Sequence, residues 1–155
     1  MKISKISVKC CTVLFFVFLL SVLTCYPQVW AVEVPFSGKI TIGAGFDGAE
    51  SVFAADVDGD GDMDVLGAAY DADEIAWWEN IAGDASTWIK HSIDNMFDGA
   101  KSVSAADLDN DGDMDILGAA YLGDKVAWWE NTVGDGSQWI IHIIDSDFGR
   151  AESVL

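Results

Sequence analysis

The stretch DVDGDGDMD, residues 56–64, places an aspartate at every second position. The stretch DLDNDGDMD, residues 107–115, repeats this spacing, again with glycine at the sixth position. Alternation along a tight turn can direct several oxygens at one centre, and glycine permits the sharp bend. Calcium takes about six to eight oxygen ligands, so the pattern predicts one Ca²⁺ ion per turn.

Every aspartate of the two turns is a predicted calcium ligand. In the first turn, four are expected to bind through their side chains: Asp56, Asp58, Asp60 and Asp64. Asp62 is expected to bind through its backbone carbonyl. The second turn is expected to use the corresponding set: Asp107, Asp109, Asp111, Asp113 and Asp115. Magnesium keeps more water and fits less well. The turn differs from an EF-hand, because glycine stands where that loop has its bidentate glutamate.

The alternative to a calcium site is a solvated acidic turn that binds no metal. No basic residue stands nearby in sequence to compensate the charge, and the same spacing occurs twice, so calcium is favoured.

The chain repeats itself with a period of 51 residues. GAESVFAADVDGDGDMDVLGAAY begins at Gly48, and GAKSVSAADLDNDGDMDILGAAY begins at Gly99. This self-similarity predicts complete repeats at 48–98 and 99–149, the start of a further repeat at 150–155, and the last strand of a preceding blade at 32–47. The chain is expected to be a fragment of a longer protein, or else to self-assemble into a ring.

Each repeat is expected to contain four short strands separated by Gly, Asp and Asn. In the first repeat these are about Ser51–Ala55, Asp64–Tyr70, Glu74–Glu79 and Trp88–Ile93. Several strands are apolar on both faces, as in a sheet buried on both sides. The prediction is an all-β fold of four-stranded antiparallel β-propeller blades, with about two blades complete. A solenoid is the rival architecture, and a sandwich is third.

Residues 1–31 have the features of a secretory signal peptide. Three lysines precede an apolar run, and Val29 and Ala31 occupy the small-residue positions of a cleavage site. An uncleaved anchor is the alternative, although the run is short for a membrane span. All three cysteines lie here, so the mature domain is expected to have no disulfide. After cleavage of the signal peptide, no stable membrane insertion is expected.

The charge restricts the partners of the chain. It has 26 acidic and 8 basic residues and a net charge of −18, which disfavours nucleic acids and anionic membranes. A hydrophobic content of 51% still permits a packed core.

The stretch FDGAESVFAADVDGDGDMDVLGAA, residues 46–69, resembles an FG-GAP/VCBS repeat, the type that builds the integrin α-subunit head. Phe46 and Gly48 approximate the opening of that motif, although Asp47 intervenes, and Gly67-Ala68 approximates its close without the usual proline. The resemblance covers roughly residues 38–155. It implies a β-propeller with structural calcium in an exported or surface protein, often one for adhesion or carbohydrate binding.

Other residues recur at the repeat period. Aromatic platforms can bind sugars, but periodic recurrence favours packing between blades for Trp77, Trp78, Trp88, Trp128, Trp129 and Trp139. His91 and His142 also recur, which indicates a structural place rather than a catalytic base or zinc ligand.

The sequence therefore predicts a secreted or cell-surface, non-catalytic, calcium-binding propeller module with an unidentified glycan or protein ligand. No nucleophile motif or phosphate loop occurs in it. The alternative is the propeller part of a secreted polysaccharide-degrading enzyme, a lyase or a glycosidase, because paired carboxylates can serve a glycosidase.

Overall fold

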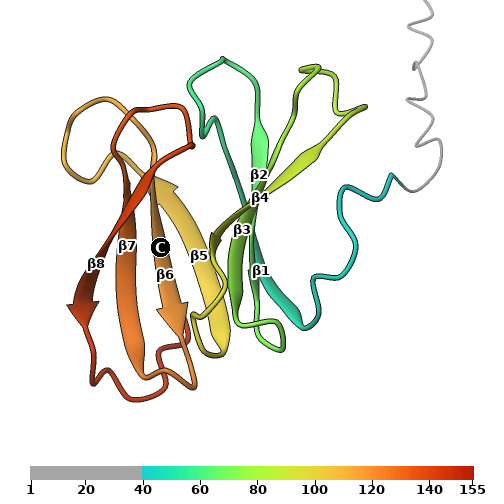
Figure 1. The fold of residues 1–155 in the computed structure, drawn as a ribbon. Helices are drawn as coiled ribbons and strands as arrows, with labels where there is room; N and C mark the ends of the chain where they lie inside the picture. Colours follow the sequence, from blue (N-terminus) through green and yellow to red (C-terminus); the bar gives the residue numbers. More distant parts are fainter. Residues whose placement is uncertain (1–39) are drawn as a thin grey trace, which may run out of the picture. The chain divides into compact units, whose positions relative to one another are not determined.

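The computed structural model describes residues 40–155, and the regular elements there are all β-strands. Each repeat forms one four-stranded antiparallel sheet in which consecutive strands are neighbours (Figure 1). The first sheet comprises β1 (Ala49–Ala55), β2 (Asp64–Ala69), β3 (Glu74–Glu79) and β4 (Ile89–Asp94). The second comprises β5 (Ala100–Ala106), β6 (Asp115–Ala120), β7 (Lys125–Asn131) and β8 (Trp139–Asp145). The all-β prediction of two four-stranded blades is confirmed for these residues.

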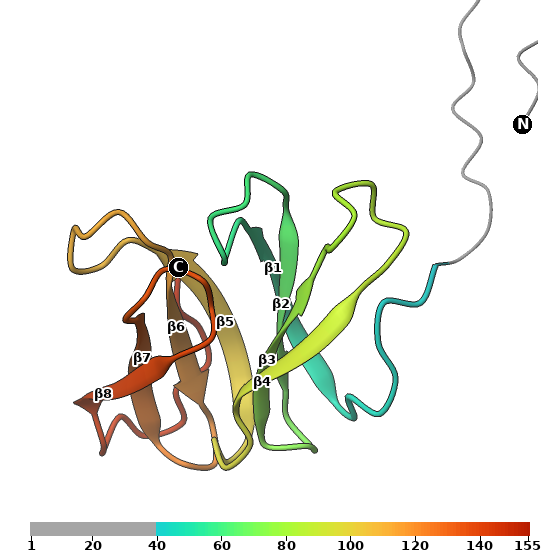
Figure 2. The same cartoon turned by 45° about the horizontal axis from the view of Figure 1, so that its top comes forward.

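The two sheets share one hydrophobic core. Leu66, Ile75 and Trp77 of the first sheet pack in one cluster with Ile116 and Trp129 of the second. Strand β5 lies beside β1 and β2, as the two views show (Figures 1 and 2). Because β2 and β3 are covered on both sides, most of their residues are buried, which explains why they are apolar without alternation.

An aspartate in the β2–β3 turn holds the connection between the repeats. The Asp73 carbonyl accepts the amide of Phe97 at 2.9 Å, and its Oδ1 accepts the amide of Gly99 at 2.7 Å. In the second repeat, Asp124 makes the same two bonds to the amides of Phe148 and Arg150. The chain therefore leaves both sheets along the same path.

Residues 150–155 lie against the second sheet in the way that β5 lies against the first. The Val103 amide donates to Ser51 Oγ at 3.3 Å, and the Val154 amide donates to Ser102 Oγ at 3.2 Å. Val154 is buried, although no strand is assigned to this segment. It occupies the place where the first strand of a following sheet would begin.

The segment 40–47 differs from the expected last strand of a preceding blade at 32–47, because it contains no strand. A strand needs a neighbour for its backbone hydrogen bonds, and none of the eight strands of residues 40–155 pairs with this segment. Phe46 instead packs edge-on against Trp78 with ring centroids 4.9 Å apart, as Phe97 does against Trp129.

The predicted signal peptide, its cysteines and residues 32–39 lie outside the described residues. In the part of the chain that is described, no helix has the length and apolar character to cross a membrane.

Candidate metal centre

The two Asp-rich turns connect the first and second strands of each sheet and have the same backbone form. Gly61 and Gly112, at the sixth position, have φ values of +96° and +102°, which a residue with a side chain rarely adopts. The amide of Gly61 donates to Asp56 Oδ2 at 3.0 Å, and the amide of Gly112 donates to Asp107 Oδ2 at 3.2 Å. The first aspartate of each turn therefore closes the bend over its glycine.

Each turn gathers three carboxylates. Asp56, Asp58 and Asp64 each offer an oxygen, and the three atoms lie within 4.8 Å of one another. Asp107, Asp109 and Asp115 form the equivalent group in the second turn. Positions one, three and nine of the predicted ligand set thus converge in both repeats. Their role as ligands stays a prediction.

The other four predicted ligands lie outside these groups. The Asp62 amide donates to Asp60 Oδ1 at 2.8 Å, and the Asp113 amide donates to Asp111 Oδ1 at 2.9 Å. The carboxylate of Asp62 lies so close to Gly83 that a Cβ at that glycine would overlap it. These contacts shape the turn, and the predicted metal contacts of the four residues remain expectations.

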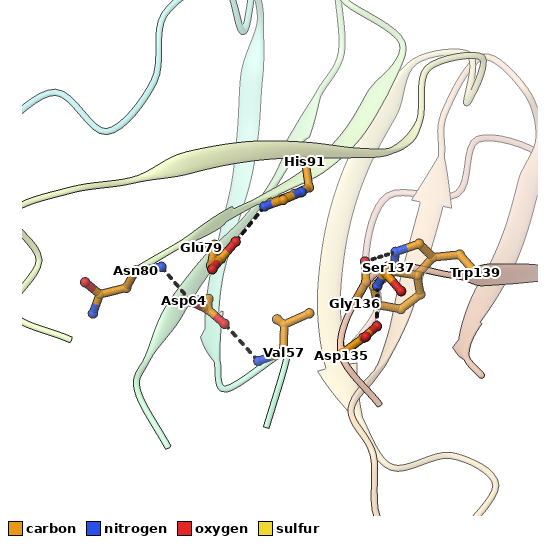
Figure 3. Close-up of polar contacts among 9 residues, drawn as sticks. All are labelled: Val57, Asp64, Glu79, Asn80, His91, Asp135, Gly136, Ser137 and Trp139. Atoms are coloured by element: carbon orange, nitrogen blue, oxygen red, sulfur yellow. Dashed lines mark hydrogen bonds and ion pairs between the residues drawn. The ribbon is translucent and has the colours of Figure 1, made fainter. Parts of the chain in front are cut away.

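The last aspartate of each turn fixes the turn to its sheet. Asp64 is buried, its Oδ2 accepts the Val57 amide at 3.0 Å, and its Oδ1 accepts the Asn80 amide at 2.9 Å (Figure 3). The second turn repeats both bonds at 2.9 Å, with Asp115 accepting the amides of Leu108 and Asn131. A carboxylate oxygen has more than one lone pair, so these bonds leave acceptor capacity for an ion.

The electrostatics of the turns disfavour unscreened negative charge. Burial raises the pKa of Asp58, and neighbouring Asp64 and Asp60 raise it further. Burial also raises the pKa of Asp64, against the opposing effect of the Asn80 and Val57 amides. Desolvation and then the charges of Asp111 and Asp115 raise the pKa of Asp109. A raised pKa means that the fold favours neutralisation of these carboxylates, which a bound cation provides.

One carboxylate oxygen at the site has no partner in the protein. Asp56 Oδ1 is buried and makes no hydrogen bond. A buried polar atom left unpaired costs about 1–3 kcal/mol, so such atoms normally have a ligand, a water or an ion. Asp56 lies within the first carboxylate group. The donor set, all hard oxygens with one of them unpaired, suits a calcium ion.

Two asparagines belong to the site, although the sequence reasoning did not single them out. Asn80 Nδ2 donates to the Met63 carbonyl at 3.3 Å, and Asn80 Oδ1 accepts the Ala85 amide at 3.0 Å. Asn131 makes the corresponding local bonds, to the Met114 carbonyl at 3.4 Å and from the Gly136 amide at 3.1 Å. The sequence feature that could have indicated them is the asparagine that ends AWWEN in both repeats.

The recurrent aromatic and histidine residues lie mainly in packing positions. Trp77 and Trp129 are buried in the core that the two sheets share, as packing between blades predicts. Trp78 is also buried, but it packs against Phe46 of the segment 40–47. His91 stacks on Trp77 with ring centroids 4.6 Å apart, and its Nε2 lies 2.8 Å from a Glu79 oxygen (Figure 3). The second repeat has the same arrangement of Trp128, His142 and Glu130. The histidines thus have the structural place that their recurrence predicts.

Comparison with known proteins identifies the central part of the chain. Residues 56–118, from the first Asp-rich turn into β6, match the family model described as an FG-GAP-like repeat. No curated protein and no solved structure was found to match the chain. The match includes both Asp-rich turns in full and therefore both carboxylate groups.

Proposed function

We propose that the chain, whose residues 56–118 match an FG-GAP-like repeat, is an exported, non-catalytic β-propeller module that binds calcium and recognises a glycan or protein ligand. The observation that carries the calcium proposal is the pair of equivalent carboxylate groups, together with the buried, unpartnered Oδ1 of Asp56. Equivalent oxygen groups at the same place in two repeats are unlike scattered surface acids.

Calcium would be held in the first turn by Asp56, Asp58 and Asp64, and in the second by the equivalent three residues. Asp60, Asp62, Asp111 and Asp113 are proposed as additional ligands from their spacing. When bound, the ion supplies positive charge that offsets the repulsion among the carboxylates. The turn then becomes a rigid link between the first two strands of each sheet. The role is structural, and we assign no reaction to it.

Titration calorimetry and thermal unfolding test the metal proposal. We expect about one calcium per complete repeat, with dissociation constants near 10⁻⁴–10⁻³ M. At about tenfold excess of free calcium, each bound ion adds roughly 1.4 kcal/mol to the free energy of unfolding. The test variant carries both Asp58→Asn and Asp109→Asn, which keep the size of the side chains and remove their charge. It should lose most of the calcium binding. Absence of binding heat and of a thermal shift with chelator would sink the proposal.

The export and binding roles need separate measurements. The signal features of residues 1–31 support export, and sequencing the amino terminus of the secreted protein should place cleavage before Val32. The resemblance to adhesion and carbohydrate-binding repeats supports the ligand class. A glycan array and a panel of extracellular matrix proteins test it. Polysaccharide turnover that is lost on changing a single carboxylate outside the two turns would instead favour an enzyme.

A further inference from the structure

One hydrogen bond joins the first Asp-rich turn to the second repeat. Asn131 ends β7, its side chain is completely buried, and its Nδ2 donates to the Val57 carbonyl at 3.0 Å. Val57 stands between Asp56 and Asp58, two members of the first carboxylate group. The bond therefore fixes the peptide that connects two of the proposed ligands.

The loop between β7 and β8 covers the same turn. A Cβ at Gly59 would lie 3.6 Å from the Gly134 carbonyl oxygen, so the two backbones run close together. Val57 is 1% exposed, whereas Leu108, its counterpart in the second turn, is 41% exposed. The following repeat thus partly covers the first turn, and within residues 40–155 no later repeat covers the second.

Asn131 also contacts the second turn. Its backbone amide donates to Asp115 Oδ1 at 2.9 Å, and its Nδ2 lies 3.4 Å from the Met114 carbonyl oxygen. One buried residue therefore connects Asp115, a member of the second carboxylate group, with the Val57 carbonyl of the first turn. Asn80 makes the same bonds within its own repeat, but within residues 40–155 it has no hydrogen bond to the second turn.

We infer that Asn131 is a positioning residue that completes the first calcium site from the following repeat and couples calcium binding to the contact between repeats. This inference rests on the proposed calcium function. The first site is then the tighter of the two, because its ligands are held in place before the ion arrives. Coupling is reciprocal, so calcium at the first site stabilises the β7–β8 loop of the second repeat.

The test isolates each site in the full chain. Asp109→Asn disables the second site, so calorimetry reports the first, and Asp58→Asn does the reverse. We expect the first site to bind calcium more tightly than the second. In the Asp109→Asn background, Asn131→Ala should weaken the first site by about tenfold, the loss expected for one buried hydrogen bond.

Asn80→Ala in the Asp58→Asn background is the matched control. It removes the same local bonds of the other repeat, and it should leave the affinity of the second site unchanged, because Asn80 does not touch that turn. Equal affinities of the two sites, with no effect of Asn131→Ala on the first, would overturn the coupling and leave the calcium proposal standing. Absence of calcium binding at both sites would overturn both.

Hydrogen exchange keeps the inference testable if Asn131→Ala does not fold. In the Asp109→Asn chain, calcium should slow exchange of the Gly136 amide, which is bonded to Asn131 Oδ1. In the Asp58→Asn chain, calcium should leave exchange of the Ala85 amide, which is bonded to Asn80 Oδ1, unchanged. Equal protection, or none, at these two amides contradicts the coupling.

Discussion

The two Asp-rich turns have the same spacing and the same internal hydrogen bonds, yet they lie in different surroundings. Asp56 and Asp58 are half-buried, whereas Asp107 and Asp109 are exposed. The cause lies outside the turns, because the second repeat encloses the first turn through Asn131 and the β7–β8 loop. Within residues 40–155 no loop of a following repeat lies over the second turn. The environment of a repeat is thus determined by its neighbour as much as by its own residues.

The largest expected effect on the free energy of unfolding concerns Trp77 and its counterpart in the second repeat, Trp128. Trp77 is 1% exposed in the core shared by the two sheets, whereas its counterpart Trp128 is half-buried. Trp77→Ala should lower the free energy of unfolding by about 3–5 kcal/mol, because it leaves a cavity between the repeats. Trp128→Ala should cost clearly less. Chemical denaturation measures both, and equal losses would show that the second sheet does not depend on the first for its environment.

A smaller effect is expected at the β7–β8 loop. Gly136 has φ +67°, and a Cβ there would lie 2.6 Å from the Trp77 ring. Gly136→Ala should therefore destabilise the fold by about 1–3 kcal/mol through overpacking.

The first repeat supplies the control for this substitution. Ala85 stands at the corresponding place with φ 59°, and Ala85→Gly should be neutral or slightly stabilising, because glycine tolerates that conformation. Thermal unfolding compares the two variants. A well-tolerated Gly136→Ala would argue against close contact between the loop and Trp77.

The sequence was sufficient to predict the elements that depend on local chemistry. The expected strand Glu74–Glu79 is β3, and Asp64–Tyr70 is β2 with one residue fewer. The strand expected to begin at Trp88 begins at Ile89, since Trp88 Nε1 donates to the Ala85 carbonyl and belongs to the loop. Turn chemistry and apolar runs carry these signals over a few residues.

What the sequence could not predict depends on contacts between distant residues. Asn131 reaches Val57 across 74 positions, and no local pattern marks that pairing. The segment 40–47 has the apolar character of a strand but has no strand neighbour in the described chain and forms no strand there. The convergence of three carboxylates in each turn required the bend geometry as well as the spacing.

Two equivalent serines, Ser51 and Ser102, each accept a backbone amide from the segment that follows their own sheet. Ser51 Oγ accepts the Val103 amide between the sheets, and Ser102 Oγ accepts the Val154 amide of the last six residues. Ser51→Ala should lower global stability by about 0.5–1.5 kcal/mol, as expected for one lost hydrogen bond. Ser102→Ala should instead speed hydrogen exchange of the Val154 amide with little effect on the two sheets, because this bond holds residues 150–155 and does not join one sheet to the other. A global loss as large as that of Ser51→Ala would contradict this distinction.

The smallest expected effect tests whether charge also distinguishes contacts between repeats. Lys101 Nζ lies 3.0 Å from Glu50 Oε1 across the two sheets, and Glu50, Lys101 and Glu152 occupy the same position in successive repeats. The hydrogen bond to Glu50 raises the pKa of Lys101 above its ordinary value of 10.5, and the negative charges of Glu50 and Glu152 raise it further. The stabilisation is therefore complete at neutral pH and is lost as the pH rises beyond that value.

Lys101→Glu should place three like charges along this edge and lower the Tm by less than Ser51→Ala does, because the pair is partly exposed. The decrease should vanish at about 1 M salt, where the Debye length is about 3 Å. Lys90→Glu is the control, since Lys90 pairs with Glu74 inside the first sheet at 2.7 Å. Only Lys101→Glu should also speed exchange of the Val103 amide, which crosses between the repeats. The same change in the control would mean that the charge acts on the whole sheet and not on the contact between repeats.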